Sequence, residues 1–465
     1  MFIDRDSEMD FLEETYKNKK NSLILLYGRR RIGKTFLLKE FLKNKKNIYF
    51  MATQEEKIQL IRNFSMKIAE FYNDNVIYNN PLKDWDSLFQ YIVQKNNGEK
   101  IVIAMDEITY IIEKDKSFLS IFQKYYDEYF INQNTMFIIS GSLINIVYTE
   151  ILNYNSPLYG RRTGNIKIEE FDFKSVYRYL NANIDYAIKI YALTGGIPYY
   201  LSLINKNKDL MHQFISKNNI FYNDALFILR EELKSPEKYF TILRLISSGK
   251  NKINEISNIM NYNSNELSPY IDKLISMEII EKEYPLFNKK RNSLIYKIKS
   301  NYFNFYFKYL FENQSYIENN EYEFVNSLIN KNMNEYISTI FEEICIQFIK
   351  EYSWKILNSK IISIGKWWGN NINKKKGKDI EEIDIIGIDD KNNNIYGEVK
   401  YKNVKAGIDV LDNLKRKASL FNTINNTYII FSYTGFKDDL INISKIEKDV
   451  VLIDSGKMEN IIKKF

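Results

Sequence analysis

The chain of 465 residues contains one cysteine, one histidine and six prolines. The single cysteine, Cys345, excludes a disulfide framework and a zinc site built from cysteines. It lies in a helical pattern, FEEICIQF, where we expect a small core residue. The single histidine, His212, argues against histidine triads and multi-histidine metal sites. Any chemistry must therefore use carboxylates, lysines, arginines, hydroxyls or backbone amides.

Long hydrophobic runs are also missing. No segment approaches the roughly 20 apolar residues of a membrane span, and the start, MFIDRDSEMD, is acidic and has no apolar signal core. We therefore expect a cytoplasmic protein that does not bind a membrane. The formal net charge of +7 permits an acidic partner without requiring one. With 45% hydrophobic residues the chain is globular, and its length suggests about three domains.

The strongest motif lies in SLILLYGRRRIGKTFLLKEFL. An apolar strand runs into Gly28-x4-Gly33-Lys34-Thr35, and a helical pattern follows, which is the context that a phosphate-binding loop requires. Backbone amides and the helix start would surround the phosphates, with Lys34 on the β and γ phosphates and Thr35 on Mg²⁺. The arginines of the loop are expected to anchor it. The predicted nucleotide-binding residues here are Gly28, Arg29, Arg30, Arg31, Ile32, Gly33, Lys34, Thr35 and Phe36.

Two further strands end in polar residues. KIVIAMDEITYII predicts a buried strand that ends in Asp106 and Glu107. Asp106 would hold the magnesium ion and Glu107 would polarise the attacking water; the alternative is a strand followed by an acidic helix start. TMFIISGS ends in Ser140 and Ser142. In nucleotide-hydrolysing proteins whose sheet has an extra strand between the strands of these two motifs, a polar residue at the end of that strand senses the γ phosphate. Ser140 or Ser142 would have this role here, although either serine could instead cap the next helix.

Several segments together resemble the archaeal-type ATPases of the STAND branch of the AAA+ group. They are FIDRDSEMDFL, YGRRRIGKT, MDEITY, SGSLINIV, SPLYGRRTGNIKI and TGGIPYYL, and the likeness continues through the later parts of the chain. The resemblance implies a P-loop NTPase domain over residues 1–235, with a parallel sheet and a helical lid at about 171–235. It implies ATP as the ligand and hydrolysis of ATP as the reaction.

The same resemblance assigns further residues. Ile3, Arg5 and Glu8 would lie near the adenine, and the lid motif Gly195 to Pro198 would contact the nucleotide. Two adjacent arginines, Arg161 and Arg162, are candidates for stabilising the charge of the transferred phosphate. They would act within one chain or across to a neighbouring copy in a homo-oligomer; the alternative is a solvated surface or an ion pair.

Residues 236–312 are predicted to form a winged helix-turn-helix. The helical pattern from Ile253, a turn at Tyr262, a second helix from Ser264 and two strand-like segments give that order. The second helix exposes a surface that is not basic, so the wing tip Lys289-Lys290-Arg291 would supply most of the attraction for phosphates. DNA contact and a protein-interaction role both remain open.

The segment 325–465 has the order helix, three strands, helix, strand. It resembles the PD-(D/E)xK nuclease superfamily, a restriction-endonuclease-like α/β fold, and the tail domain fused to archaeal-type ATPases. The resemblance implies that Asp384 and Glu398 share Mg²⁺ with the Val399 carbonyl, that Lys400 positions water, and that Glu342 completes the shell. Glu398 and Lys400, in NIYGEVKYKN, lie two residues apart and hence on one face of a strand.

KWWGNNINKKKGK places five lysines within thirteen residues before the acidic strand. They offer a positive approach for a polyanion, with Trp367 and Trp368 available for base stacking; the alternatives are a solvated loop and core tryptophans. The sequence thus predicts a multi-domain α/β ATPase coupled to a nuclease-like tail that acts on nucleic acid, with DNA favoured. The alternatives are an ATP-dependent switch with a silent tail and a protein partner, and a regulator that uses the winged helix alone.

Overall fold

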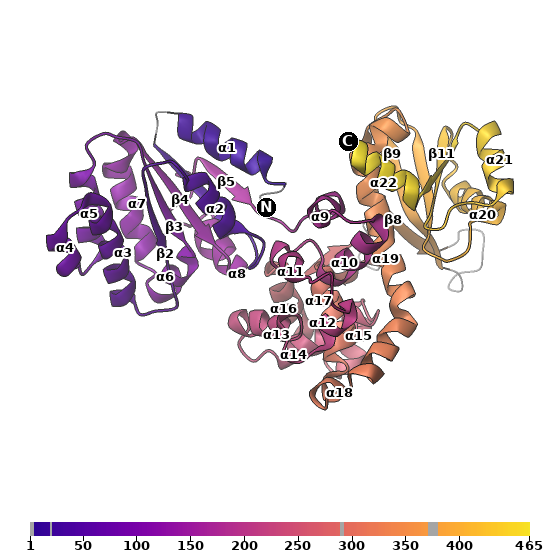
Figure 1. Ribbon diagram of the computed structural model, residues 1–465, viewed down its shortest axis with the longest axis horizontal. Coiled ribbons are helices and arrows are strands. Elements are labelled where there is room, and N and C mark those ends of the chain that lie inside the picture. Colours follow the sequence, from indigo (N-terminus) through magenta and orange to yellow (C-terminus); the bar gives the residue numbers. More distant parts are fainter. Residues whose placement is uncertain (1–3, 19–20, 289–292, 371–379) are drawn as a thin grey trace. The chain divides into compact units, whose positions relative to one another are not determined.

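The computed structural model describes residues 4–18, 21–288, 293–370 and 380–465. The chain divides into two compact units (Figure 1). Unit 1 consists of Met1–Glu170 and Ile197–Tyr199, and unit 2 consists of Phe171–Gly196 and Tyr200–Phe465. No helix in the described ranges is both long enough and apolar enough to cross a membrane.

Unit 1 is built on a parallel sheet of five strands in the order β2-β3-β4-β1-β5. The strands are β1 (Ser22–Tyr27), β2 (Asn47–Met51), β3 (Ile101–Asp106), β4 (Thr135–Gly141) and β5 (Gly164–Lys167). Because β4 lies between β1 and β3, the predicted insertion of a strand between the two nucleotide motifs is present. The carboxyl ends of β1, β3 and β4 therefore meet at one edge of the sheet.

Alternate residues of the central strands pack on opposite faces of this sheet, as strand geometry requires. Leu23 and Leu25 belong to one buried cluster, while Ile24 and Leu26 belong to the other. The helices of unit 1 are α1 (Asp6–Lys17), α2 (Lys34–Leu42), α3 (Lys57–Tyr72), α4 (Asn75–Asn79), α5 (Trp85–Lys95), α6 (Ile108–Lys114), α7 (Phe118–Glu128) and α8 (Ile144–Ile146). Residues of α1 and α2 pack on the face that carries Ile24, and residues of α3, α5, α6 and α7 pack on the other face.

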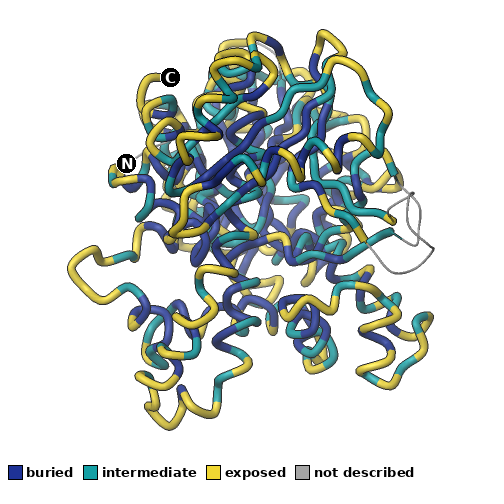
Figure 2. The backbone as a smooth tube through the Cα atoms, turned by 90° about the vertical axis from the view of Figure 1, so that its right-hand side faces the viewer, coloured by how far each residue is buried: buried dark blue, intermediate teal, exposed yellow. Residues whose placement is uncertain are grey.

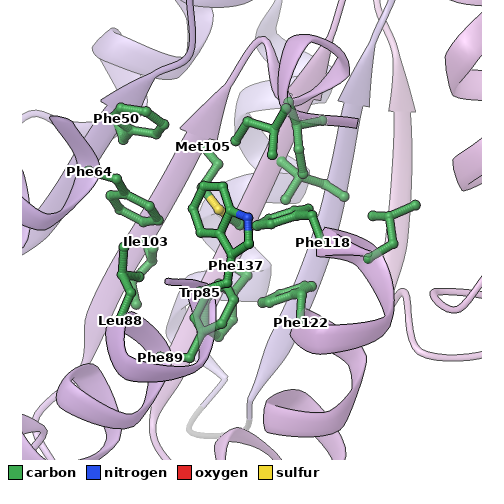
Figure 3. Packing of buried hydrophobic residues seen from close by; sticks show 14 of the residues in the cluster. Phe50, Phe64, Trp85, Leu88, Phe89, Ile103, Met105, Phe118, Phe122 and Phe137 are labelled. Carbon is green, nitrogen blue, oxygen red and sulfur yellow. The ribbon is translucent and has the colours of Figure 1, made fainter. Parts of the chain in front are cut away.

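The larger cluster is rich in aromatic side chains (Figure 3). Trp85 contacts Phe118 edge to face, and Phe122 contacts Phe137 of β4 in the same way. Burying one such side chain stabilises the fold by roughly 1.5–3 kcal/mol. The indole N–H of Trp85 donates to Asp115 at 3.1 Å, so its polar group is satisfied inside the core. This packing fixes the sheet that carries the nucleotide motifs.

Unit 2 begins with five helices, α9 (Phe173–Leu180), α10 (Ile184–Thr194), α11 (Pro198–Leu203), α12 (Leu210–Ile215) and α13 (Ile220–Glu232), of which only the first turn of α11 belongs to unit 1. The sequence grouped residues 171–235 with the ATPase domain, whereas in the structure nearly all of them cluster with the C-terminal part. Tyr336 makes some of the contacts that join them to it, because its buried hydroxyl lies 2.9 Å from the carbonyl oxygen of Ala192 and 3.1 Å from that of Asn301.

The next elements follow the order predicted for a winged helix-turn-helix. They are α14 (Glu237–Ser247), α15 (Ile253–Met260), α16 (Ser264–Ser276), β6 (Ile280–Glu283) and β7 (Ile295–Ile298). β6 and β7 pair antiparallel. The predicted wing tip Lys289-Lys290-Arg291 lies outside the described residues, so its role stays a prediction.

A continuous helix connects these elements to the tail. After α17 (Asn301–Phe305), a π-helical turn (Tyr306–Phe311) and α18 (Gln314–Glu318), α19 runs from Tyr322 to Ile356 over 35 residues. The sequence placed the start of this helix at Asn334 and a domain boundary at residue 325. Both fall inside α19, so the chain has no linker at that boundary.

The tail contains a second five-stranded sheet, in the order β12-β11-β10-β9-β8. Its elements are β8 (Ile361–Asn370), β9 (Ile380–Asp389), β10 (Asn394–Lys400), α20 (Ile408–Ala418), β11 (Asn426–Ser432), α21 (Asp438–Ile446), β12 (Val450–Asp454) and α22 (Ser455–Lys464). The predicted order holds up to β11. The sequence treated β11 as the last strand, and this was wrong, because β12 pairs parallel to it and forms the sheet edge.

Figure 2 shows the backbone coloured by how far each residue is buried. Leu411 and Leu414 of α20 join a core cluster with Ile430 of β11. On α19, Phe348 contacts Phe431 of β11 at 6.2 Å between ring centroids, and Cys345 is fully buried, as expected for a small core residue. The tail sheet is thus covered by α20 and by α19.

Candidate functional sites

The loop between β1 and α2 depends on its two glycines. A Cβ at Gly28 would lie 2.2 Å from the carbonyl oxygen of Ile168 and 2.3 Å from Cδ1 of Ile32, so a side chain has no room there. Gly33 has open space around it but adopts φ +94°, a conformation that favours glycine. It serves as the N-cap of α2, which starts at Lys34. The glycines therefore shape the loop for different reasons, one by packing and one by backbone angle.

Lys34 is buried and turns back over the loop. Its Nζ donates to the carbonyl oxygens of Gly28 at 2.9 Å and Arg29 at 3.0 Å. The Glu107 carboxylate lies 4.0 Å from the same ammonium group. Glu107 itself is fixed by Ser142, whose backbone N–H and hydroxyl donate to its Oε2 at 3.1 and 2.6 Å. The predicted water-polarising acid is thus held beside the predicted phosphate-binding lysine.

Asp106 is fully buried at the end of β3 and gathers several donors. The hydroxyls of Thr35 and Tyr49 donate to its Oδ2 at 2.7 and 2.9 Å, and the Ser140 hydroxyl donates to its Oδ1. Burial and the charge of Asp106 raise the pKa of Tyr49. Ser140 and Ser142 thus contact the two acids rather than capping a helix, and Tyr49 is a site residue that the sequence reasoning missed.

Two of the three loop arginines, Arg30 and Arg31, contact tyrosines. The Arg30 guanidinium donates to the hydroxyl of Tyr110 on α6. The Arg31 guanidinium lies 4.2 Å from the centre of the Tyr199 ring, and the Tyr199 N–H donates to the Arg31 carbonyl at 3.3 Å. Tyr199 directly follows Pro198 of the predicted lid motif, and both belong to unit 1. The loop and the residue that follows that motif are therefore in contact, while the contact of the motif with the nucleotide stays a prediction.

Other predicted nucleotide-site residues lie around this loop. Arg5 donates to the carbonyl of Glu169 at 2.6 Å and pairs with Glu8 at 3.2 Å. Ile32 is buried, whereas Phe36 on α2 is 53% exposed. Ile3 lies outside the described residues.

Arg161 and Arg162 precede β5, at the edge of the sheet where β1 begins. Arg161 binds Asp127 with Nε and Nη2, each at 2.8 Å from a carboxylate oxygen. Arg162 donates to Oδ1 of Asn165 at 3.0 Å. The phosphate loop follows the opposite end of β1, one strand length away, so Arg161 does not reach the loop of its own chain. The intrachain role is wrong for Arg161 in this structure, and a contact across to another copy stays a prediction.

In the tail, Glu398 and Lys400 of β10 lie side by side, as the two-residue spacing predicts. Lys400 Nζ lies 2.6 Å from Glu398 Oε1. A second lysine that the sequence reasoning missed, Lys417 of α20, donates to Glu398 Oε2 at 3.0 Å. A signal was available, since Lys417 follows Leu411 and Leu414 at helical spacing and therefore lies on the buried stripe of α20.

Asp384 lies on β9, next to this pair. Its Oδ2 accepts the Val399 N–H at 2.8 Å. Burial, followed by the negative charges of Glu398 and Glu342, raises the pKa of Asp384 to about 7. The structure therefore brings Asp384, Glu398 and Lys400 into one site.

Glu342 of α19 faces the site but is bound by Lys366 of β8 at 2.6 Å. Among the residues that the structure describes, no three Asp, Glu, His or Cys side chains are grouped closely enough to hold one metal ion. The assignment of Glu342 as a ligand that completes the shell is not supported in this conformation, because Lys366 occupies its carboxylate. A metal here would rest on Asp384, Glu398 and the Val399 carbonyl, and Mg²⁺ commonly uses one or two carboxylates and fills its shell with water or phosphate.

The β6–β7 hairpin packs against the tail within unit 2. The Leu286 N–H donates to the Lys366 carbonyl at 2.8 Å, and the Trp368 indole N–H donates to the Ser293 carbonyl at 3.1 Å. Lys297 of β7 pairs with Glu343. A cavity of about 570 Å³ lies between these elements and is lined by Lys297, Lys366, Trp368 and Asp384, among others.

The two tryptophans are partly buried. Trp367 contacts Phe421 at 4.9 Å between ring centroids, and Trp368 lines the cavity. Of the five lysines in KWWGNNINKKKGK, Lys366 is placed and the other four lie outside the described residues. The positive approach that they were expected to form stays a prediction.

Comparisons with known proteins agree with this arrangement. Residues 2–204 match the family described as "ATPase domain predominantly from Archaea", and residues 306–411 match one described as "Archaea bacterial proteins of unknown function". An uncharacterized protein of Methanocaldococcus jannaschii is 31% identical over 411 residues, covering 87% of this chain and 88% of that protein. An uncharacterized ATP-binding protein of the same organism is 56% identical over 46 residues, covering 10% of this chain and 78% of that protein.

Among solved structures, the Walker-type ATPase of Pyrococcus abyssi is similar, with a TM-score of 0.51 and 23% identity, covering 66% of this chain and 96% of that one. This likeness supports the P-loop ATPase fold. The phosphate loop, the buried acid of β3 and the relative that matches along most of its length lead to one conclusion. The chain belongs to the archaeal ATPase family and is an ATP-binding ATPase with a C-terminal sheet domain.

Proposed function

We propose that the ATPase reaction is Mg²⁺-dependent. Mg²⁺ would neutralise the phosphate charge that develops during hydrolysis. The support is the convergence of Thr35 and Asp106, since a hydroxyl and a carboxylate at these positions are oxygen ligands of the kind that Mg²⁺ prefers. Lys34 would exchange its two loop carbonyls for phosphate oxygens, and Glu107, beside Lys34, would orient the attacking water.

We further propose that nucleotide state in unit 1 controls a metal-dependent, nuclease-like site in the tail, with nucleic acid as its substrate. The observation that carries this proposal is the grouping of Asp384, Glu398 and Lys400. Two carboxylates on neighbouring strands, Asp384 on β9 and Glu398 on β10, can hold a metal ion beside a phosphodiester, and a lysine there can position water. Trp368, which lines the cavity at the hairpin, offers an aromatic ring for stacking with a base, and Lys297 and Lys366 line the same cavity.

The experiment is incubation of the full-length chain with Mg²⁺, ATP and mixed DNA and RNA substrates. We expect cleavage that is lost in Asp384→Ala and Lys400→Ala, while ATP hydrolysis continues. A matched control is Asp390→Ala, since Asp390 is an exposed acid just beyond the end of β9. Cleavage that persists in both site variants would refute the tail assignment.

A second candidate is an ATP-dependent switch with a silent tail that binds a protein partner. It is favoured by the pairing of Glu398 and Glu342 with lysines and by the absence of a metal-binding group of three acids in the described residues. This candidate predicts neither cleavage nor salt-dependent binding of nucleic acid. The incubation above, together with DNA binding measured at two salt concentrations, separates the two proposals.

A further inference from the structure

The tail site contains more lysines than its strand motif supplies. Lys400 and Lys417 occupy the two carboxylate oxygens of Glu398, and Lys366 occupies Glu342 Oε2. The three lysines come from β10, α20 and β8. Elements distant in sequence thus deliver one ammonium group each to the same few carboxylates.

Lys417 is the most informative of the three because it is buried. Its side chain is 11% exposed, and that of Glu398 is 7% exposed. Lysines are almost never fully buried unless they are paired, since removing the charge from water is costly. Lys417 therefore depends on an anionic partner inside the site and cannot simply turn out to solvent.

With every group ionised, the charges of the site balance in the chain alone. Asp384, Glu398 and Glu342 then contribute three carboxylates, and Lys366, Lys400 and Lys417 contribute three ammonium groups. A divalent cation that binds Glu398 must separate it from its lysines and leaves them without an anionic partner. A phosphate group arriving with the metal supplies that partner. Metal and phosphate should therefore bind better together than either does alone.

We propose that Lys366, Lys400 and Lys417 form the phosphate-binding group of the tail, and that they hold its carboxylates until metal and phosphate arrive together. This inference rests on the proposed tail function and adds Lys366 and Lys417 to it as phosphate-binding residues. The lysines act as partners for the carboxylates in one state and for the phosphodiester in the other. The site consequently resists metal in the absence of nucleic acid.

The test measures Ca²⁺ binding to the nucleotide-free, full-length chain by calorimetry, with and without a short DNA oligonucleotide. The tail component is the binding that Asp384→Ala removes, which separates it from any other cation site. The variants are Lys417→Gln and Lys366→Gln, with Lys417→Arg as the charge-preserving version. The control is Lys415→Gln, because Lys415 lies on the same helix and pairs with Glu447 at 2.5 Å, away from the site carboxylates. Thermal melts check that each variant is folded.

In the parent, we expect DNA to tighten Ca²⁺ binding about tenfold, since the coupling energies of linked sites usually correspond to 5–150-fold. Each glutamine variant should bind Ca²⁺ more tightly without DNA and should lose most of the DNA effect. Lys417→Arg and Lys415→Gln should behave like the parent. Unchanged Ca²⁺ affinity in both glutamine variants would overturn the inference while leaving the tail function standing. If no protein shows a tail component, with or without DNA, both fall. Should Lys417→Gln not fold, Lys366→Gln alone decides, because Lys366 and Glu342 are only partly buried.

Discussion

The Thr35 hydroxyl donates a 2.7 Å hydrogen bond to Oδ2 of Asp106. This bond joins the first turn of α2, which follows β1, to the end of β3, which lies two positions from β1 in the sheet. Ser140 approaches the other oxygen of Asp106 from the intervening strand β4. These contacts tie the phosphate loop, the buried acid and the intervening strand together at one edge of the sheet. The aromatic core of unit 1 positions the strands that carry them.

Glu107→Gln should separate ATP binding from hydrolysis. Glutamine keeps the hydrogen bonds of Ser142 but cannot polarise water as a carboxylate does, so we expect ATP to bind normally while turnover falls by roughly 10²-fold or more. Lys34→Ala should lose both. Phosphate release and calorimetric ATP binding measure the two effects. Glu113→Gln, an exposed acid on the same helix, should match the parent. Parental turnover in Glu107→Gln would contradict the assignment.

Tyr199 should tune the phosphate loop through its ring. Tyr199→Phe keeps a π face for the Arg31 guanidinium, whereas Tyr199→Ala removes a contact worth roughly 0.5–2 kcal/mol. We expect ATP affinity to fall severalfold in the alanine variant and to stay near parental in the phenylalanine variant. Tyr154→Ala is the control, since Tyr154 is 77% exposed. Equal affinities in the two Tyr199 variants would show that the ring does not act on the loop.

Gly196 should tolerate no side chain. A Cβ there would lie 1.7 Å from the Phe171 carbonyl oxygen, and the neighbouring atoms are backbone, which cannot move aside cheaply. We expect Gly196→Ala to destabilise the fold by roughly 2–4 kcal/mol, at the upper end of overpacking effects. Gly365→Ala, where the nearest atom is 3.7 Å away, should cost under about 1 kcal/mol by the same reasoning. Denaturant unfolding compares the two, and equal costs would count against the tight contact.

Asp384 should make stability depend on pH. Its raised pKa of about 7 means that the folded chain disfavours the ionised form, so the stability present below pH 4 is lost as pH rises towards 7. Asp384→Asn removes this loss. With metal chelated, we expect the variant to gain on the parent progressively from pH 4 to 7, reaching roughly 4 kcal/mol at about 1.4 kcal/mol per pKa unit, and staying constant above pH 7. A difference that does not vary with pH would refute the shift.

The sequence was sufficient where local geometry decides the outcome. The spacing of Glu398 and Lys400 predicts their contact, and the loop motif predicts the position of Lys34. It was insufficient where tertiary packing decides. Lys417 and Lys366 reach the carboxylates from other elements, and Arg161 lies at the far edge of the sheet because its strand begins there. The helices of residues 171–235 cluster with the C-terminal part, where Tyr336 contacts α10, rather than with the sheet that precedes them in sequence. The pattern of residues within one sequence does not show which distant elements pack together.

Helix α19 restricts where the chain can be cut into separate fragments. At about 1.5 Å per residue it is a rod about 52 Å long. Near its middle, the Tyr336 hydroxyl donates to the Ala192 carbonyl of α10. Glu342, six positions farther along, forms the salt bridge to Lys366. Farther along, Gln347 accepts the Phe173 N–H, and Glu351 pairs with Lys174. A truncation at residue 325 falls inside α19, so a fragment that lacks the tail also loses the contacts that α19 makes with α9 and α10. The helices α9 and α10 are thereby fixed to the same continuous helix that carries Glu342 of the tail site.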